Sequence, residues 1–172
     1  MEFERFSLSA AGACEQETQE IYTEAVKALI ERGLTVATAE SCTGGLIGKL
    51  FTDVSGASAT LAGGMITYTN HIKINKLGVS AETIEKHTEV SFECAAEMAS
   101  RAREYFEVNL GVSATGFAGP GGGNEKDPVG TVYLGISSKE KTRVYRLSFG
   151  ECSRGEIRYG VAALAAKKLL EA

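Results

Sequence analysis

The stretch LTVATAESCTGGLIGKLFTDV, residues 34–54, carries the signals of a buried strand, a tight turn and a helix in direct succession. Its first seven residues are mostly apolar or β-branched, which predicts a short buried strand. Apolar residues from Leu46 onward recur at helical spacing, which predicts an amphipathic helix after the two glycines. Ser41, Cys42 and Thr43 are therefore expected in the turn between this strand and this helix.

The rest of the chain continues this alternation of helices and strands. Helical spacing of apolar residues predicts helices over 15–33, 70–78, 80–87, 91–107 and 153–172. Alternating or continuous apolar runs predict strands over 59–69, 108–116, 129–137 and 142–149. We therefore expect an α/β fold, a three-layer α/β/α sandwich with a mixed sheet.

Turn and cap residues separate these elements. The stretch FAGPGGGNEKDP, residues 117–128, combines four glycines with both prolines of the chain, which predicts a loop. The polar stretch 138–141 predicts the turn of an antiparallel hairpin. We expect Ser80 and Ser91 to cap the helices that follow them, and Gly33 to end the first helix.

Length and composition predict one soluble domain with its own core. The chain has 172 residues, of which 44% are hydrophobic and 23% are charged. We expect this domain to span 15–172, behind a mobile N-terminal segment over 1–14. The formal net charge of −4 argues against a broad basic surface, so we expect no nucleic-acid partner. The sequence has no long apolar run, so we expect no membrane partner and a cytoplasmic location.

The residue types that bind metals form no recognisable ligand pattern. Cys14, Cys42, Cys94 and Cys152 are widely spaced with no C-x-x-C pair, and the chain holds two histidines. Buried free thiols are the simpler interpretation of these cysteines. We therefore expect no metal site.

Two predicted loops follow strand ends, where α/β proteins usually bind ligands. They are the turn at 40–45 and the loop that begins at Thr115. Amide N–H groups at the start of the helix after the first turn could hold a phosphate or an oxyanion, whereas Ser41 or Thr43 could equally be a plain helix cap. Residues 43–50 lack the first glycine and the Ser or Thr of a P-loop, and no G-x-S-x-G surrounds the serine. Spacing alone leaves the reaction open.

Five blocks of sequence taken together are more specific than any single motif. They are TAESCTGGLIGKLFTDVSGAS, GGMITYTNHIKINKLGV, VSFECAAEMA, TGFAGPGGGNEKDPVGTVYLG and GEIRYGVAALA. In this order and approximate spacing they closely resemble the C-terminal domain of the competence/damage-inducible CinA family, over roughly 25–170. Active members of that family are nicotinamide-nucleotide amidohydrolases.

The resemblance implies that the chain deamidates nicotinamide mononucleotide to nicotinate mononucleotide and ammonia, without a cofactor. By similarity, Ser41 is the nucleophile, and Lys73 and Tyr68 are its activating partners. A lysine accepts the serine proton only when it is neutral, and burial favours that form by lowering the lysine pKa. The alternative is that Tyr68 is a half-buried strand aromatic and Lys73 a solvated helix charge. Cys42 is expected to point into the core.

Further residues are expected to bind the substrate. Asn70 is expected to cap the helix that carries Lys73, and Thr115 to present a hydroxyl. Arg154 and Arg158 are candidates for binding the phosphate, or else surface or helix-capping arginines. The whole expected binding set comprises Thr43, Gly44, Gly45, Asn70, Thr115, Gly116, Gly119, Gly121, Gly122, Arg154 and Arg158.

Two other functions are compatible with the same residues. One is a catalytically inactive module that binds a pyridine nucleotide. The other is a structural partner of a CinA-type pyrophosphatase domain. We also expect that a domain of this size can assemble as a homo-oligomer.

Overall fold

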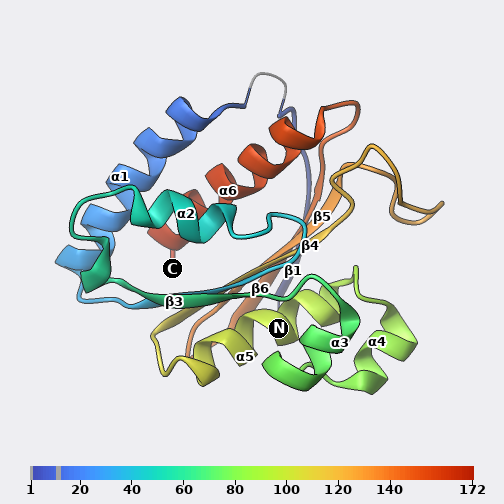
Figure 1. Ribbon diagram of the computed structural model, residues 1–172, viewed down its shortest axis with the longest axis horizontal. Coiled ribbons are helices and arrows are strands. Elements are labelled where there is room, and N and C mark those ends of the chain that lie inside the picture. Colours follow the sequence, from blue (N-terminus) through green and yellow to red (C-terminus); the bar gives the residue numbers. More distant parts are fainter. Residues whose placement is uncertain (1, 11–12) are drawn as a thin grey trace.

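A six-stranded mixed sheet forms the middle layer of the structure, a computed structural model that describes residues 2–10 and 13–172 (Figure 1). Its strands are β1 Glu2–Ser7, β2 Val36–Glu40, β3 Leu61–Ile66, β4 Leu110–Gly116, β5 Thr131–Ser137 and β6 Thr142–Ser148. Their order across the sheet is β1-β6-β5-β4-β2-β3. Strand β2 runs parallel to β3 and β4, β5 is antiparallel to β4 and β6, and β1 is parallel to β6.

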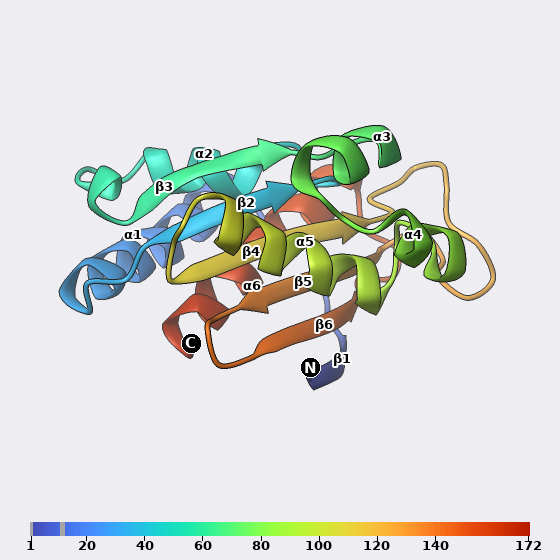
Figure 2. The same ribbon diagram turned by 90° about the horizontal axis from the view of Figure 1, so that it is seen from below.

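Helices cover both faces of the sheet, as two perpendicular views show (Figures 1 and 2). Those on one face are α1 Glu15–Glu31, α2 Leu46–Thr52 and α6 Arg154–Leu170. Those on the other face are α3 Asn70–Ile72, α4 Ala81–His87 and α5 Phe92–Tyr105. The predicted three-layer sandwich with a mixed sheet is confirmed. Among the described residues, no helix combines the length and the apolar character needed to cross a bilayer.

Strand β1 lies at one edge of the sheet, although we expected residues 1–14 to form a mobile segment. The ring of Phe3 lies 4.5 Å from that of Phe92 in α5, and the ring of Phe6 lies 5.8 Å from that of Tyr145 in β6. These aromatic contacts stabilise β1. The polar composition of the segment did not predict a strand there. The residues of this segment that lie outside the described ranges are 1, 11 and 12.

The helix ends follow the sequence signals in part. Gly33 adopts a φ of 64° after α1, as a C-terminal glycine does. The Ser91 hydroxyl accepts a hydrogen bond from the Cys94 N–H at 3.1 Å and so caps α5. Ser80 precedes α4, but its side chain makes no cap bond; the Glu97 carboxylate of α5 accepts the Ser80 N–H at 2.7 Å instead. The cap of α4 therefore comes from a neighbouring helix, which sequence spacing does not reveal.

Helix α5 packs directly on strands β4 and β5, while the main apolar cluster fills the space under α1, α2 and α6. The close approach of α5 requires a residue without a side chain on the sheet below it. A Cβ atom added at Gly111 would lie 2.0 Å from the carbonyl oxygen of Ala99, and one at Gly135 would lie 2.7 Å from that of Ala95. These two glycines therefore fix the spacing between this helix and the strands that lead to the site described below.

Gly111→Ala is expected to lower the free energy of unfolding by about 2 kcal/mol or more, because the added methyl group forces α5 away from β4. Chemical denaturation of the purified variant measures this change. Gly155→Ala is the matched control, since a Cβ atom there meets nothing within 4 Å. An unchanged denaturation midpoint for Gly111→Ala would contradict the close packing of α5 on the sheet.

Candidate active site

Ser41 lies directly after β2, at the edge of the sheet where the parallel strands β2, β3 and β4 all end. This is the edge at which α/β folds usually bind ligands. The Ser41 N–H donates to the carbonyl oxygen of Ala114 at 2.9 Å, which ties the start of the turn to β4. Gly44 and Gly45 then take φ values of 60° and 94°, which glycine adopts without strain. The turn brings the chain from the strand straight into α2.

Glu40 holds the end of this turn from inside the protein. Its side chain is buried, and its carboxylate accepts hydrogen bonds from the N–H groups of Gly45 at 2.9 Å, Ile47 at 3.1 Å and Gly48 at 2.8 Å. Sequence reasoning missed this role, because a glutamate at a strand end gives no local signal of capping a helix five residues later. The Gly45 amide, expected to bind substrate, donates to Glu40 instead.

Arg158 of α6 holds the same turn from outside. Its Nε and Nη2 atoms donate to the carbonyl oxygen of Thr43 at 3.2 Å and 2.6 Å. Thr43 itself is fully buried. A guanidinium that donates twice to one carbonyl fixes the orientation of that peptide. The structure therefore places Arg158 as a support of the turn, whereas we expected it either to bind the phosphate or to be a surface or helix-capping arginine.

Lys73 reaches the turn from the opposite helical layer. It opens a π-helical turn, Lys73–Leu77, and its side chain is completely buried, unlike the solvated charge that was the alternative. The Lys73 Nζ atom lies 3.2 Å from Ser41 Oγ and donates to the carbonyl oxygen of Thr67 at 2.8 Å. The structure therefore brings together the two residues that the family resemblance pairs.

The helix that leads to Lys73 begins with a different cap from the expected one. Thr69, in an extended conformation, accepts the Ile72 N–H at 3.3 Å and is the N-cap of α3. Asn70 is the first helical residue and is exposed, so the prediction that it caps this helix is wrong. Threonine and asparagine are both favoured at the N-cap position, so the sequence Thr69-Asn70 alone does not show which of the two is the N-cap.

The surroundings of Lys73 favour its neutral form. Burial lowers the pKa of the Lys73 amine below its usual value, while Cys94, Glu89 and Cys42 raise it by a smaller amount. Among the described residues, no carboxylate lies within ion-pair distance of its Nζ atom. Desolvation without a counter-ion makes this lysine a candidate base.

Cys42 is the neighbouring nucleophile candidate, and its environment is unfavourable. Its side chain belongs to the main apolar cluster, as expected. Burial raises the pKa of the Cys42 thiol to about 12. Because the thiolate and not the thiol is the nucleophile, this environment argues against Cys42 as the nucleophile.

A pocket of about 230 Å³ opens over Ser41 and Lys73. The other predicted residues that line it are Tyr68, Thr115, Gly116 and Arg154. Four lining residues were not predicted to line a site: Cys42, Glu89, Val90 and Phe117. The pocket therefore combines three hydroxyls, a thiol, an amine, a carboxylate, a guanidinium and two aromatic rings.

Tyr68 and Thr115 line the pocket, but the placement of their hydroxyl groups differs from that expected from the sequence. Tyr68 lies beyond the end of β3 and is 61% exposed, and among the described residues no hydrogen bond joins its hydroxyl to Ser41 or Lys73. The Thr115 hydroxyl donates to the carbonyl oxygen of Glu89 at 2.7 Å, which leaves its lone pairs for a ligand. Toward a ligand, the Thr115 hydroxyl is therefore a hydrogen-bond acceptor.

Some predicted binding residues lie outside the pocket lining. They are Thr43, Gly44, Gly45, Asn70, Gly119, Gly121, Gly122 and Arg158. Gly119 still contributes indirectly, because its carbonyl oxygen accepts a hydrogen bond from Arg154 Nη1 at 2.7 Å. The glycine-rich loop therefore orients Arg154 at the pocket.

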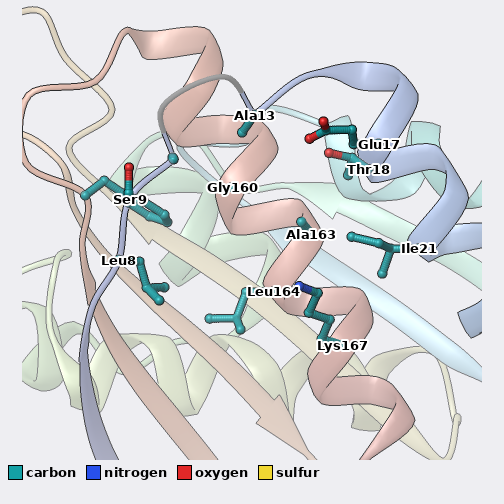
Figure 3. Close-up of a pocket in the computed structure, with 12 residues that line it drawn as sticks. Leu8, Ser9, Ala13, Glu17, Thr18, Ile21, Gly160, Ala163, Leu164 and Lys167 are labelled. Carbon is teal, nitrogen blue, oxygen red and sulfur yellow. The ribbon is translucent and has the colours of Figure 1, made fainter.

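A separate hollow of about 220 Å³ lies between α1, α6 and the segment after β1 (Figure 3). Figure 3 shows Glu17 and Ile21 on α1 and Leu164 and Lys167 on α6 around it. None of the predicted catalytic or binding residues lines this hollow. In the part of the chain that the structure describes, no three His, Cys, Asp or Glu residues are grouped to hold a metal ion.

Comparison with protein families gives a match to the CinA C-terminal domain over residues 18–172. A relative named putative competence-damage inducible protein, from Halothermothrix orenii, is 52% identical over 124 residues, which are 72% of this chain and 30% of that protein. A CinA-like protein from Chlorobaculum tepidum is 44% identical over 91% of this chain and 39% of its own length. The chain thus spans about a third of the length of these curated relatives.

Solved structures match over nearly their full length. The competence/damage inducible protein CihA from Agrobacterium tumefaciens superposes with a TM-score of 0.87 at 36% identity, covering 90% of this chain and 94% of that one. A CinA superfamily protein from Klebsiella pneumoniae 700603 superposes with a TM-score of 0.86 at 30% identity, covering 90% and 96%. The fold and the sequence therefore indicate the same family.

Proposed function

This chain belongs to the CinA C-terminal domain family, and from that premise we propose that it is a nicotinamide-nucleotide amidohydrolase that uses Ser41 as its nucleophile. The observation that carries the proposal is the 3.2 Å contact between Ser41 Oγ and the Nζ atom of the fully buried Lys73. An amide carbonyl reacts with a hydroxyl only when a base removes the hydroxyl proton. A desolvated lysine at hydrogen-bond distance meets that requirement.

In the proposed first step, neutral Lys73 takes the proton from Ser41 Oγ, and Oγ bonds to the carboxamide carbon of nicotinamide mononucleotide. The Thr67 carbonyl keeps one N–H of the amine directed toward it, so the lone pair can face the serine. The carbonyl oxygen of the substrate becomes an oxyanion. The N–H groups of Cys42 and Thr43 are the proposed donors, because those of Gly45, Ile47 and Gly48 already bind Glu40.

In the next step, the tetrahedral intermediate collapses and the C–N bond breaks. Lys73 returns its proton to the leaving nitrogen, which departs as ammonia and leaves a nicotinoyl ester on Ser41. A water molecule, deprotonated by the same amine, then attacks the ester carbon; the bond from that carbon to Ser41 Oγ breaks, Lys73 returns the proton to Oγ, and nicotinate mononucleotide leaves. One lysine acts as base and as acid in turn, and no cofactor enters the proposed sequence.

The pocket suggests how the substrate is held. A pocket of about 230 Å³ has room for the pyridine ring, so the ribose phosphate would extend toward exposed Arg154. Arg154 is the proposed phosphate ligand, since a guanidinium matches phosphate oxygens in geometry and charge. Tyr68 stays in the proposal as the second activating side chain, because it lines the pocket and its exposure leaves it free to turn toward Ser41.

Ammonia release is expected with nicotinamide mononucleotide and scarcely with free nicotinamide. Only the mononucleotide carries a phosphate whose binding energy can orient the amide against Ser41. Coupled assay of ammonia measures both reactions under the same conditions. Equal turnover of the two compounds would remove the phosphate site from the proposal.

Two results would favour the other functions. Binding of the mononucleotide in calorimetry without any ammonia would indicate an inactive nucleotide-binding module. Absence of both binding and turnover would indicate a structural role beside a pyrophosphatase domain. Either result would contradict the proposed activity.

Ser41→Ala is expected to lower turnover by ~10³-fold or more, because the covalent nucleophile is lost. Cys42→Ala is expected to retain most activity and to lower the free energy of unfolding by about 1 kcal/mol, because it removes a small buried side chain. Steady-state kinetics and circular dichroism of both variants test this pair. The reverse pattern of activity would assign the nucleophile to Cys42.

The rate is expected to rise with pH through the pKa of Lys73, which lies below the usual lysine value of 10.5 because the amine is buried. Because the protonated amine cannot act as a base, activity is lost as pH falls through this pKa. Lys73→Arg is expected to lose ~10²-fold to 10⁴-fold in kcat, since guanidinium keeps its proton. A pH series of kcat for the wild type and the variant measures both effects.

Lys76→Arg is the matched control for Lys73→Arg, because Lys76 lies in the same turn but is exposed. It is expected to keep wild-type kcat. An active Lys73→Arg enzyme with a raised KM would mean that Lys73 attracts the phosphate and does not remove the serine proton.

A further inference from the structure

Glu40 is an unusual residue to find at the end of a central strand. Its side chain is 1% exposed, and every residue of β2 is buried. A buried carboxylate costs several kcal/mol unless polar groups surround it. Among the described residues, no Lys, Arg or His lies within ion-pair distance of it. Its compensation comes from three backbone N–H groups and the Thr38 hydroxyl at 3.3 Å.

The three N–H groups belong to the first turn of α2 and its preceding residue. Helix ends of this kind are usually capped by a Ser, Thr, Asp or Asn at the N-cap position, where this chain has Gly45. The cap instead comes from a residue before the turn, so Glu40 spans it and joins both ends of 41–44. A capping side chain that bridges the turn fixes the shape of the turn as well as the helix start.

Two further contacts complete the support of this turn. The Ser41 N–H donates to the carbonyl oxygen of Ala114, and the Thr43 carbonyl accepts two hydrogen bonds from Arg158. The turn is therefore held at its beginning by β4, at its middle by α6 and at its end by Glu40. Ser41 is the first residue of this turn, and its Oγ lies 3.2 Å from Lys73 Nζ.

We propose that Glu40 is a positioning residue, whose carboxylate holds the start of α2 so that Ser41 stays in line with Lys73 and the N–H groups of the turn face the pocket. This inference rests on the proposed function, since it assumes that Ser41 is the nucleophile. Misplacing a reacting group by about 1 Å can lower a rate by about 10²-fold. Loss of the Glu40 carboxylate therefore acts on kcat and not on the affinity for substrate.

Positioning of the turn by Glu40 differs from an electrostatic effect of Glu40 on the Lys73 amine. The groups that change the Lys73 pKa are its own burial, Cys94, Glu89 and Cys42. Among the described residues, the Glu40 carboxylate contacts the Thr38 hydroxyl and the N–H groups of the turn, and it makes no hydrogen bond or ion pair with the Lys73 amine. Replacing Glu40 therefore changes the height of the pH profile of kcat and leaves its acid limb in place.

The experiment compares Glu40→Gln with Glu97→Gln. Glutamine keeps the size of Glu40 but sets an NH₂ group among N–H donors. Glu97→Gln is the matched control, because Glu97 accepts the Ser80 N–H before α4 and is not part of the pocket. Each variant is checked by circular dichroism and thermal unfolding before kcat, KM and the pH profile are measured with nicotinamide mononucleotide.

Glu40→Gln is expected to lower kcat by ~10²-fold, with KM within about threefold of wild type and the acid limb unmoved. Glu97→Gln is expected to lower the unfolding temperature and to keep kcat. Wild-type kcat for folded Glu40→Gln, a shifted acid limb, or an equal loss in Glu97→Gln would overturn the proposal. If Glu40→Gln does not fold, Glu40→Asp replaces it; its carboxylate is one methylene shorter, and a loss of at least about tenfold in kcat is expected.

A second measurement separates this proposal from the proposed function. A fluorophosphonate reagent labels activated serines whatever their natural substrate, and intact-mass spectrometry follows the rate. Labelling of Ser41 that is ~10²-fold slower in Glu40→Gln supports positioning even if the wild type releases no ammonia from the mononucleotide. Equal labelling rates in the two proteins would overturn the role of Glu40 while leaving the amidohydrolase proposal intact.

Discussion

A lysine amine buried without a carboxylate partner is the constraint around which this site is arranged. Taking an ammonium ion out of water is unfavourable, so burial shifts Lys73 toward the neutral amine and lowers its pKa. Within the described residues, the amine contacts the Thr67 carbonyl and the Ser41 hydroxyl. Neither partner carries a charge that would restore the proton. The free energy that the fold loses by burying this group is what favours the neutral amine, the form that can accept a proton.

Glu40 is a buried acid at the same edge of the sheet, and the groups that surround it differ from those around Lys73. Glu40 is surrounded by backbone N–H donors from the start of α2, whereas Lys73 has one carbonyl and one hydroxyl. The carboxylate accepts hydrogen bonds from the backbone of the turn, and the amine contacts the side chain of Ser41 at its start. A mixed sheet makes this possible, because the parallel ends of β2, β3 and β4 bring both residues to one edge. Helices from both outer layers then converge on Ser41.

Much of this arrangement follows from the sequence, and the remainder depends on contacts between distant residues. The alternation of apolar runs predicts the three-layer sandwich, and the family resemblance pairs Ser41 with Lys73, which the structure places 3.2 Å apart. Strand β1 was not predicted, because it is stabilised by contacts of Phe3 and Phe6 with Phe92 and Tyr145, which lie far along the chain. The N-cap of α3 is Thr69, one residue before the expected Asn70. The support from Glu40 and Arg158 was missed because no local pattern reports which distant backbone group a buried side chain will reach.

Titration of the Lys73 amine itself tests the central claim most directly. In protein labelled with ¹⁵N at lysine Nζ, nuclear magnetic resonance follows each amine through its pKa, and Lys73→Arg identifies the signal. The account predicts that Lys73 Nζ titrates below the usual lysine value of 10.5. Titration of Lys73 at or above 10.5 would contradict the account, because a lysine charged throughout the working range cannot take the proton of Ser41.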